Sequence, residues 1–197
     1  MNAVEPNASV LERMARVVEK VKDRLLRVAA ALEKAGVPYA VAGGNAVAAW
    51  VATVDEMAVR NTRDVDVLLN RRDLERAKQA LEAAGFVLEH VAGVDLFLDG
   101  ATAKAPDAVR VVFAGEKVRP EYELAAPGMD QTEIIAEGLR VIALDALLRM
   151  KLTSFRRKDQ VHLLDLIGVG LVGEKNLADL PPALADRLRE LLQDRLG

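Results

Sequence analysis

The sequence predicts an α/β (α+β) protein, with a leading helix, a small mixed β-sheet core and a C-terminal helical part. Two observations support this fold class. Short apolar and β-branched runs alternate with helical repeats between residues 36 and 115. After residue 130 the pattern changes to one short strand and three helical repeats. We therefore expect the core with its N-terminal helix over residues 1–115, and a connecting loop with the helical region over residues 116–197.

The leading helix and the first strand come before residue 43. Residues 8–35 predict one long helix that ends at Gly36 and Pro38. Its apolar residues recur at helical spacing; they are Met14, Val17, Val21, Leu25, Val28 and Leu32. PYAVA, residues 38–42, predicts a short strand that breaks at Gly43 and Gly44, and residues 45–53 predict an alanine-rich helix directly after the break.

The rest of the core alternates in the same way. Residues 64–69 predict a strand, and Asn70 is placed to cap a following helix that ends at Gly85. FVLEHV (86–91), DLFLD (95–99) and AVRVVFAG (108–115) predict three further strands. Residues 116–130 hold two prolines and many charges, which is typical of a connecting loop.

Composition excludes several classes of function. A formal charge of −3 argues against a protein that simply coats nucleic acid. The absence of cysteine excludes thiolate chemistry, and two histidines argue against a histidine-rich zinc site. The first ten residues lack the pattern of a signal peptide, and the apolar stretch 46–54 is too short to span a bilayer. We expect a cytoplasmic protein without membrane contact.

Two aspartates lie on one side of the strand at residues 64–69. Asp64 and Asp66 project from the same face because side chains alternate along a strand. Two carboxylates held this close repel each other unless a positive group lies between them. Magnesium commonly binds through one or two carboxylates together with substrate phosphates. A solvated strand face is the alternative, and the Asp-x-Asp pattern alone does not exclude it.

The glycine pair bears on the choice between these two interpretations. Gly43 and Gly44 between a strand and a helix allow close approach of a ligand to backbone amides, an arrangement that holds phosphate. A tight turn with positive φ explains the glycines equally well. A glycine turn followed by paired carboxylates nevertheless favours a site for phosphate and metal.

The segments that carry these residues resemble a known superfamily. AVAGGNAVAAW, RNTRDVDVLL and LDALLRMKLTSFRRKDQVHLLDLI resemble polymerase-β-like nucleotidyltransferases, and are closest in pattern to AbiEii-type and lincosamide-type members. The resemblance covers about residues 38–167. It implies Mg²⁺-dependent transfer of a nucleotidyl group from a nucleoside triphosphate to a hydroxyl acceptor, which is a small molecule, a protein or RNA. Two alternatives stay open: a catalytically impaired, antitoxin-like partner of this fold, and an AbiEii-like toxin acting on RNA.

The resemblance also implies roles for the residues around the glycine turn. Gly43 and Gly44 would hold the β- and γ-phosphates, with Asn45 as a further polar contact. Asp64 and Asp66 would be catalytic and would bind one or two magnesium ions.

Further residues would complete the site. Arg63 and Lys151 would contact the nucleotide, and Asp159 would bind, orient or deprotonate the acceptor. Alternative explanations are a Lys151 that extends along an amphipathic helix to solvent and an Asp159 that caps a helix beginning near Gln160. Lys158 belongs to a basic cluster that faces triphosphate, RNA or solvent; its other members are Arg149, Lys151, Arg156 and Arg157.

The sequence departs from the superfamily at Arg110. Many members have a third carboxylate at the matching strand position. An arginine cannot bind magnesium and opposes metal loading, although it can hold a phosphate bidentately. Either the site runs on two carboxylates, with Glu116 or Asp159 reaching in, or the enzyme is impaired. Without metal, we expect Arg110 to pair with Asp64 or Asp66.

Overall fold

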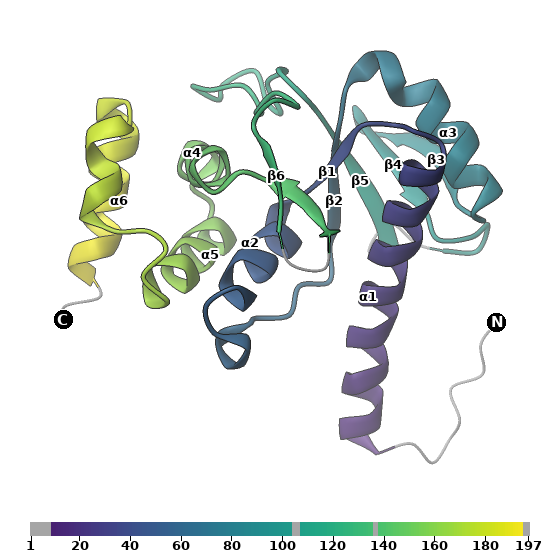
Figure 1. Ribbon diagram of the computed structural model, residues 1–197, viewed down its shortest axis with the longest axis horizontal. Helices are drawn as coiled ribbons and strands as arrows, with labels where there is room; N and C mark the ends of the chain where they lie inside the picture. Colours follow the sequence, from purple (N-terminus) through teal and green to yellow (C-terminus); the bar gives the residue numbers. More distant parts are fainter. Residues whose placement is uncertain (1–8, 104–106, 136–137, 195–197) are drawn as a thin grey trace.

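The computed structural model describes residues 9–103, 107–135 and 138–194. The expected leading helix is α1, Val10–Lys34. Ser9 and Glu12 form a capping box, in which each side chain accepts a hydrogen bond from the other residue's backbone amide. The buried residues of α1 all lie in its C-terminal half, and its N-terminal half projects away from the rest of the molecule (Figure 1).

Seven strands of the described residues form one sheet in the order β3-β4-β5-β2-β1-β7-β6. Their bounds are β1 Tyr39–Ala42, β2 Val65–Leu69, β3 Val87–Val91, β4 Val94–Leu98, β5 Ala108–Phe113, β6 Thr132–Ile134 and β7 Arg140–Ile142. The pairs β1–β7 and β2–β5 are parallel, and the other neighbours are antiparallel. The sheet is therefore mixed, which confirms the expected fold class.

The remaining helices are α2 Gly43–Ala52, α3 Leu74–Ala83, α4 Leu144–Ser154, α5 Arg157–Gly168 and α6 Pro182–Asp194. Among the residues that the structure describes in full, short 3₁₀ helices at Glu56–Ala58, Arg71–Asp73 and Glu174–Asp179 lie in the connections. In Figure 1, α1 and α3 lie at the end of the molecule that holds β3 and β4, whereas α4 and α5 lie toward the opposite end, with α6 outermost.

Three local expectations need correction. The second helix begins at Gly43 rather than after the glycines, so the glycine pair is the first turn of α2. The Asn70 side chain caps no helix; its amide donates to the Asp73 carboxylate, because residues 71–73 first form a 3₁₀ turn. Strand β6 was not expected, since a three-residue run with exposed side chains carries no recognisable alternation.

One hydrophobic core joins the sheet to the helices on both sides. Leu32 of α1, Val67 of β2, Leu147 of α4, Leu163 of α5 and Leu188 of α6 all belong to it. The expected division into residues 1–115 and 116–197 stays a prediction. Within the described residues, no helix has both the length and the apolar character needed to cross a membrane.

Candidate functional site

The glycine turn and the second aspartate lie side by side. Strands β1 and β2 pair with Ala42 opposite Asp66, and α2 starts at the next residue, Gly43. The aspartate strand therefore lies beside residues 39–42, and Gly43 lies against Asp66. Gly43 has a φ of +64°, and a Cβ atom there would lie 2.8 Å from Asp66 Cγ. Position 43 therefore requires glycine for both its backbone conformation and the space beside it.

The second glycine is enclosed from the other side. A Cβ atom on Gly44 would lie 2.8 Å from Thr62 Oγ1 and 3.1 Å from His162 Cε1. The Asn45 amide nitrogen donates to the Asp64 backbone carbonyl at 2.6 Å. Asn45 thus ties the start of α2 to the segment that carries the aspartates, and its contact with a phosphate remains a prediction.

Two cations pair with Asp64. Arg110 Nη1 lies 3.1 Å and Lys158 Nζ 3.3 Å from the same oxygen, Asp64 Oδ2. The parallel pairing of β2 and β5 places Arg110 opposite Asp66, within reach of Asp64. The expected pairing of Arg110 with an aspartate is thus confirmed. Burial alone would raise the pKa of Asp64, but Arg110 and Lys158 together hold it below its ordinary value.

The second carboxylate is in a different electrostatic state. Burial raises the pKa of Asp66 above its ordinary value, and the negative charge of Asp64 acts in the same direction. Arg110 and Lys151 oppose the shift without cancelling it. Ionising Asp66 is therefore costly in the ligand-free protein, and a bound cation would reduce that cost.

A buried ion pair lies behind Asp66. Lys151, in the last turn of α4, has only 4% of its surface exposed, and its Nζ lies 3.1 Å from Asp159 Oδ1. Burial lowers the pKa of Lys151, whereas Asp159 and Asp66 act to raise it. Lys151 therefore interacts electrostatically with Asp66, as expected if both residues belong to one site.

Asp159 is fully buried and surrounded by donors. Its carboxylate accepts hydrogen bonds from Ser154 Oγ at 2.9 Å and from Arg156 Nε at 2.7 Å, besides the Lys151 ammonium group. It also accepts from the Arg156 backbone amide and so caps α5, the alternative role foreseen for it. Burial alone would raise its pKa, but Arg156 and Lys151 lower the pKa of Asp159 to about 2. A contact with an acceptor remains a prediction.

No third carboxylate joins Asp64 and Asp66 in the described part of the chain. Glu116 follows the C-terminal end of β5 and pairs with Arg71 at 2.6 Å. Because β5 runs parallel to β2 and Arg110 stands opposite Asp66, Glu116 lies beyond the far end of both strands. The expectation that Glu116 reaches into the site was therefore wrong. Arg63 is exposed on the bend just before Asp64, and its role stays a prediction.

Two neighbours of the site had no assigned role in the sequence. Lys158 was one member of a basic cluster; the left-handed residue Phe155, with φ of +43°, separates α4 from α5 and directs the chain so that Lys158 meets Asp64. The second neighbour is His162 of α5. Among the described residues its buried Nδ1 has no partner, and burial lowers its pKa to about 4, so it is neutral at pH 7.

A separate cavity of about 1030 Å³ lies between α1 and the segment after β4. Arg16, Arg24, Asp99 and Thr102 are among the residues that line it. Arg24 is already paired with Asp99 at 3.1 Å and with Asp107 at 3.4 Å. None of the residues around the glycine turn lines this cavity, so it is distinct from the candidate site.

A family model described as "Uncharacterised nucleotidyltransferase" matches residues 9–131. No curated protein matches the chain.

Several solved structures match about nine-tenths of the chain. An antigenic nucleotidyltransferase-like protein from Paracoccidioides brasiliensis aligns with a TM-score of 0.55 and 20% identity, over 90% of this chain and 89% of that one. JHP933 from Helicobacter pylori aligns with a TM-score of 0.50 and 15% identity, over 90% and 75%. ANT(2'')-Ia in complex with adenylyl-2''-tobramycin gives 0.47 and 14%, over 89% and 98%. At these identities the first two likenesses show the fold alone. The third has a TM-score below 0.5 and is too distant to support a conclusion.

Proposed function

Because the chain belongs to the family of uncharacterised nucleotidyltransferases, within the polymerase-β-like superfamily, we propose that it transfers a nucleotidyl group from a nucleoside triphosphate to a hydroxyl acceptor with Mg²⁺. The observation that carries the proposal is the contact between the glycine turn and the aspartate strand. Gly43 places the amide end of α2 against Asp66 with no space for a side chain between them. A helix N-terminus favours phosphate and paired carboxylates favour a metal, and a metal-bound triphosphate combines both.

The donor set suits Mg²⁺ that arrives with a nucleotide. Among the described residues, no group of three or more His, Cys, Asp or Glu side chains is placed to hold a metal ion. Asp64 and Asp66 would supply carboxylate oxygens, and magnesium commonly completes its shell with water and substrate phosphates. When bound, the metal would neutralise negative charge on the phosphates during in-line displacement.

The chain's own residues bind and orient the reactants in this proposal. The backbone amides of Gly43 and Gly44 hold the β- and γ-phosphates, supported by Asn45. Arg63, Arg110 and Lys151 bind phosphate oxygens; these three residues supply positive charge around the triphosphate. The acceptor hydroxyl oxygen attacks the α-phosphorus and its proton passes to solvent, while the bond from the α-phosphorus to the bridging α–β oxygen breaks and pyrophosphate leaves with that oxygen.

Asp159 has one role that its environment favours. A general base works best with a pKa near the operating pH, and the pKa of Asp159 is about 2. Its carboxylate instead forms an ion pair with the Lys151 ammonium group, at 3.1 Å. We assign Asp159 to the positioning of Lys151, and through it to the orientation of the reactants.

A second candidate function is that of a catalytically impaired, antitoxin-like partner. Arg110 favours it, because a cation stands where a third metal-binding carboxylate is usual and pairs with Asp64. Both candidates bind nucleotide, and only the first transfers it. A toxin acting on RNA has less support, because Arg156 and Lys158 of the basic cluster are paired with carboxylates.

The experiment that tests nucleotide binding compares two glycine variants. The midpoint temperature of unfolding is measured with each of the four ribonucleoside triphosphates, with and without Mg²⁺. At a ligand concentration of 100 Kd, binding adds about 2.7 kcal/mol, or roughly 5–10 °C for a chain of this size. Gly43→Ala should abolish the shift, because its Cβ would meet the Asp66 carboxylate.

Gly115→Ala is the matched control. Gly115 has a similar φ of +73°, and nothing lies within 4 Å of a Cβ atom there. This variant shares the backbone strain but should keep the nucleotide shift. A wild-type protein that no triphosphate stabilises would overturn the proposal. Transfer is then tested with a triphosphate labelled on its α-phosphate and a cell lysate: label on an acceptor supports the transferase, and binding without label supports the impaired partner.

A further inference from the structure

We propose that Lys158 and Arg110 are exchangeable counter-ions of Asp64, which pass to the phosphates of an incoming nucleotide, so that nucleotide binds first and creates the metal site. The inference rests on the proposed function and adds two things to it. It assigns a nucleotide-positioning role to Lys158, and it gives the order in which the two ligands bind.

The two cations reach Asp64 from different elements of the fold. Arg110 comes from β5 in the sheet, and Lys158 comes from the first turn of α5. Both lie within 3.3 Å of the same carboxylate oxygen. Their side chains are 38% and 46% exposed, and that of Asp64 is 31% exposed. A dissolved ligand can therefore reach all three groups without unfolding any element.

The contact does not serve mainly to hold α5 on the sheet. Leu163 and Leu166 of α5 are fully buried, and Arg60 joins the same helix to the loop before β2 by pairing with Asp165. An exposed ion pair such as Lys158–Asp64 contributes little to stability. Its loss on ligand binding is correspondingly inexpensive, which is what an exchangeable contact requires.

The charge balance of the site favours an anion over a free metal ion. The charged side chains that ion pairs or electrostatic interactions place here, Arg63 apart, are three acids and four bases: Asp64, Asp66, Asp159, Arg110, Lys151, Arg156 and Lys158. Their formal sum is one positive charge. Such a site attracts a triphosphate and repels a dication that arrives alone. A proton on Asp66 would only increase the positive excess.

The same groups explain why nucleotide would admit the metal. A metal ion alone would have to displace two cations from Asp64 and then remain beside them. A triphosphate offers both cations new partners, bidentate for Arg110 and a point contact for Lys158. The Asp64 carboxylate then has no cation partner from the protein and can bind Mg²⁺. Nucleotide should therefore raise the affinity for Mg²⁺ and, by reciprocity, Mg²⁺ should raise the affinity for nucleotide.

Isothermal titration calorimetry tests the order of binding. The probes are Mg²⁺ alone and a triphosphate analogue with a methylene group between the α- and β-phosphorus atoms, which cannot be cleaved there. For the wild type we expect the analogue to bind in EDTA, Mg²⁺ alone to give no binding heat, and the analogue to raise Mg²⁺ affinity at least about fivefold.

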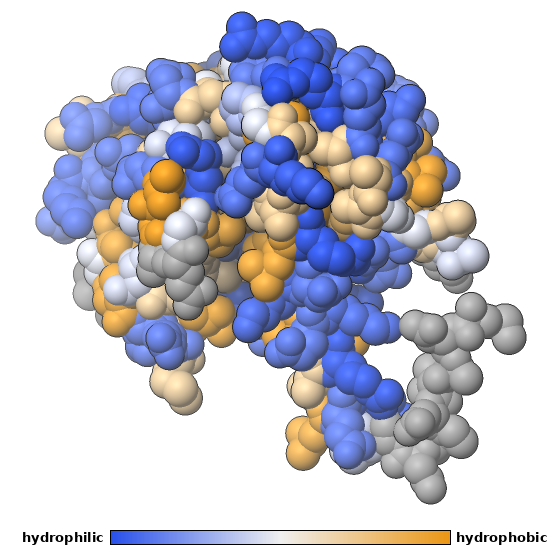
Figure 2. All heavy atoms as spheres, turned by 45° about the vertical axis from the view of Figure 1, so that its right-hand side comes forward, coloured by the Kyte–Doolittle hydropathy of each residue, from blue (hydrophilic) through white to orange (hydrophobic). Residues whose placement is uncertain are grey.

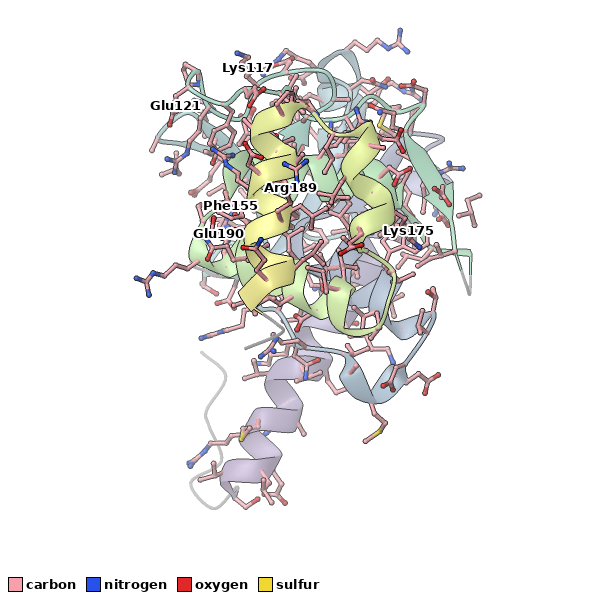
Figure 3. The ribbon with its side chains drawn as sticks, turned by 90° about the vertical axis from the view of Figure 1, so that its left-hand side faces the viewer. Lys117, Glu121, Phe155, Lys175, Arg189 and Glu190 are labelled. Atoms are coloured by element: carbon pink, nitrogen blue, oxygen red, sulfur yellow. The ribbon has the colours of Figure 1, made fainter. Side chains whose placement is uncertain are left out.

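The variants assign these effects to single residues. Lys158→Met should weaken analogue binding in EDTA by roughly 5–10-fold, as expected for a lost charge-assisted contact, and should make binding of Mg²⁺ alone detectable. Arg110→Met should act in the same directions. Lys158→Arg should restore analogue binding. Lys175→Met, an exposed lysine at the outer surface (Figure 3), should change neither affinity.

The outcomes separate this inference from the proposed function. If Lys158→Met, folded as judged by its unfolding transition, binds the analogue as tightly as the wild type, the role of Lys158 is overturned while nucleotide binding stands. The binding order is overturned if Mg²⁺ alone binds the wild type as tightly as it binds the complex with the analogue. If the wild type binds no nucleotide with or without Mg²⁺, the proposed function itself fails.

Discussion

At Asp64 a carboxylate meets two cations, whereas at Asp66, two residues further on, the carboxylate meets the glycine turn and the interior of the sheet. The pKa of Asp64 is lowered and that of Asp66 is raised. The two carboxylates therefore do not contribute equally to the unfavourable electrostatic energy of the pair. It lies in the burial of Asp66, and the partners of Asp64 already stabilise its charge.

This difference predicts opposite effects of two similar substitutions. Asp66→Asn should raise the free energy of unfolding of the ligand-free protein at pH 7, because it removes a charge whose burial is unfavourable. Asp64→Asn should lower it by about 0.5–1 kcal/mol, because two partly exposed ion pairs are lost. Urea unfolding without nucleotide or metal measures both changes.

The pH dependence of the wild type gives the control. A carboxyl group with a raised pKa binds its proton more tightly in the folded state, so the unfavourable contribution of Asp66 should diminish as pH falls through that raised pKa toward the ordinary value of 3.8. The gain from Asp66→Asn should shrink over the same pH range. A loss of stability in ligand-free Asp66→Asn at pH 7 would contradict this account of the pair.

At the scale of elements, the connection between α4 and α5 positions both lysines of the site. Phe155 turns the chain between the two helices, and Lys151 and Asp159 join the last turn of α4 to the first turn of α5. Arg187 of α6 donates to the Leu152 and Thr153 carbonyls at the end of α4 and lies over the Phe155 ring. Figure 3 shows Phe155 beside α6. Helix α6 thus supports the turn at Phe155, on which the positions of Lys151 and Lys158 depend.

Removing the Asp159 charge should destabilise this connection strongly. Asp159→Asn leaves the buried Lys151 without its counter-ion, a change that typically costs about 3–5 kcal/mol. The midpoint temperature should fall by roughly 6–20 °C. Asp186→Asn is the control, because Asp186 forms an exposed pair with Arg189 and its loss should cost less than about 1 kcal/mol. Equal stability of the two variants would contradict the role assigned to Asp159.

The same substitution has a defined pH signature. The pKa of Asp159 is depressed from 3.8 to about 2 in the folded protein, so its contribution is fully present above about pH 4. It should be lost progressively as pH falls from about 4 to 2, when the folded state takes up the proton. The stability difference between wild type and Asp159→Asn should therefore be constant from pH 5 to 8 and shrink below pH 4.

At the scale of the whole molecule, the sheet and the C-terminal helices share one core and one site. The family match ends at residue 131, but Lys151 and Lys158 follow it. By contrast, the projecting end of α1 contributes little to the core. Figure 2 shows apolar side chains along one of its sides and polar ones on the other. Five of these apolar residues are exposed: Val10, Leu11, Met14, Val17 and Val18.

Truncation from the two ends should therefore have very different results. A chain of residues 1–131 lacks β7, which pairs with β1, and lacks buried residues such as Leu147 and Leu163. We expect it to show no cooperative unfolding transition by circular dichroism. A chain that starts at residue 19 loses no buried side chain of α1, since Arg24 is the first of them, and should unfold cooperatively within a few degrees of the wild type.

The truncation also tests the division at residue 115. Cooperative unfolding of residues 1–131 would show that the C-terminal helices are a separate folding unit. Loss of the transition would show that the two parts fold together, as their common core leads us to expect.

The fold class, the order of most elements and the superfamily could all be predicted from the amino-acid sequence. These properties follow from local periodicity and from short motifs, such as Gly43-Gly44 and Asp64-x-Asp66, that lie within one or two elements. The expected pairing of Arg110 with an aspartate was also confirmed, because strand alternation assigns Arg110 to the face that carries them.

Which charged side chains of the site contact one another could be seen only in the tertiary structure. Lys158 reaches Asp64 across 94 positions of the chain, Asn45 holds the Asp64 backbone, and Glu116 lies at the wrong end of β5. None of these placements is encoded in a local pattern. They depend on strand register, on the turn at Phe155 and on the packing of α5 against α2, and these form only when distant segments bury their apolar surfaces together.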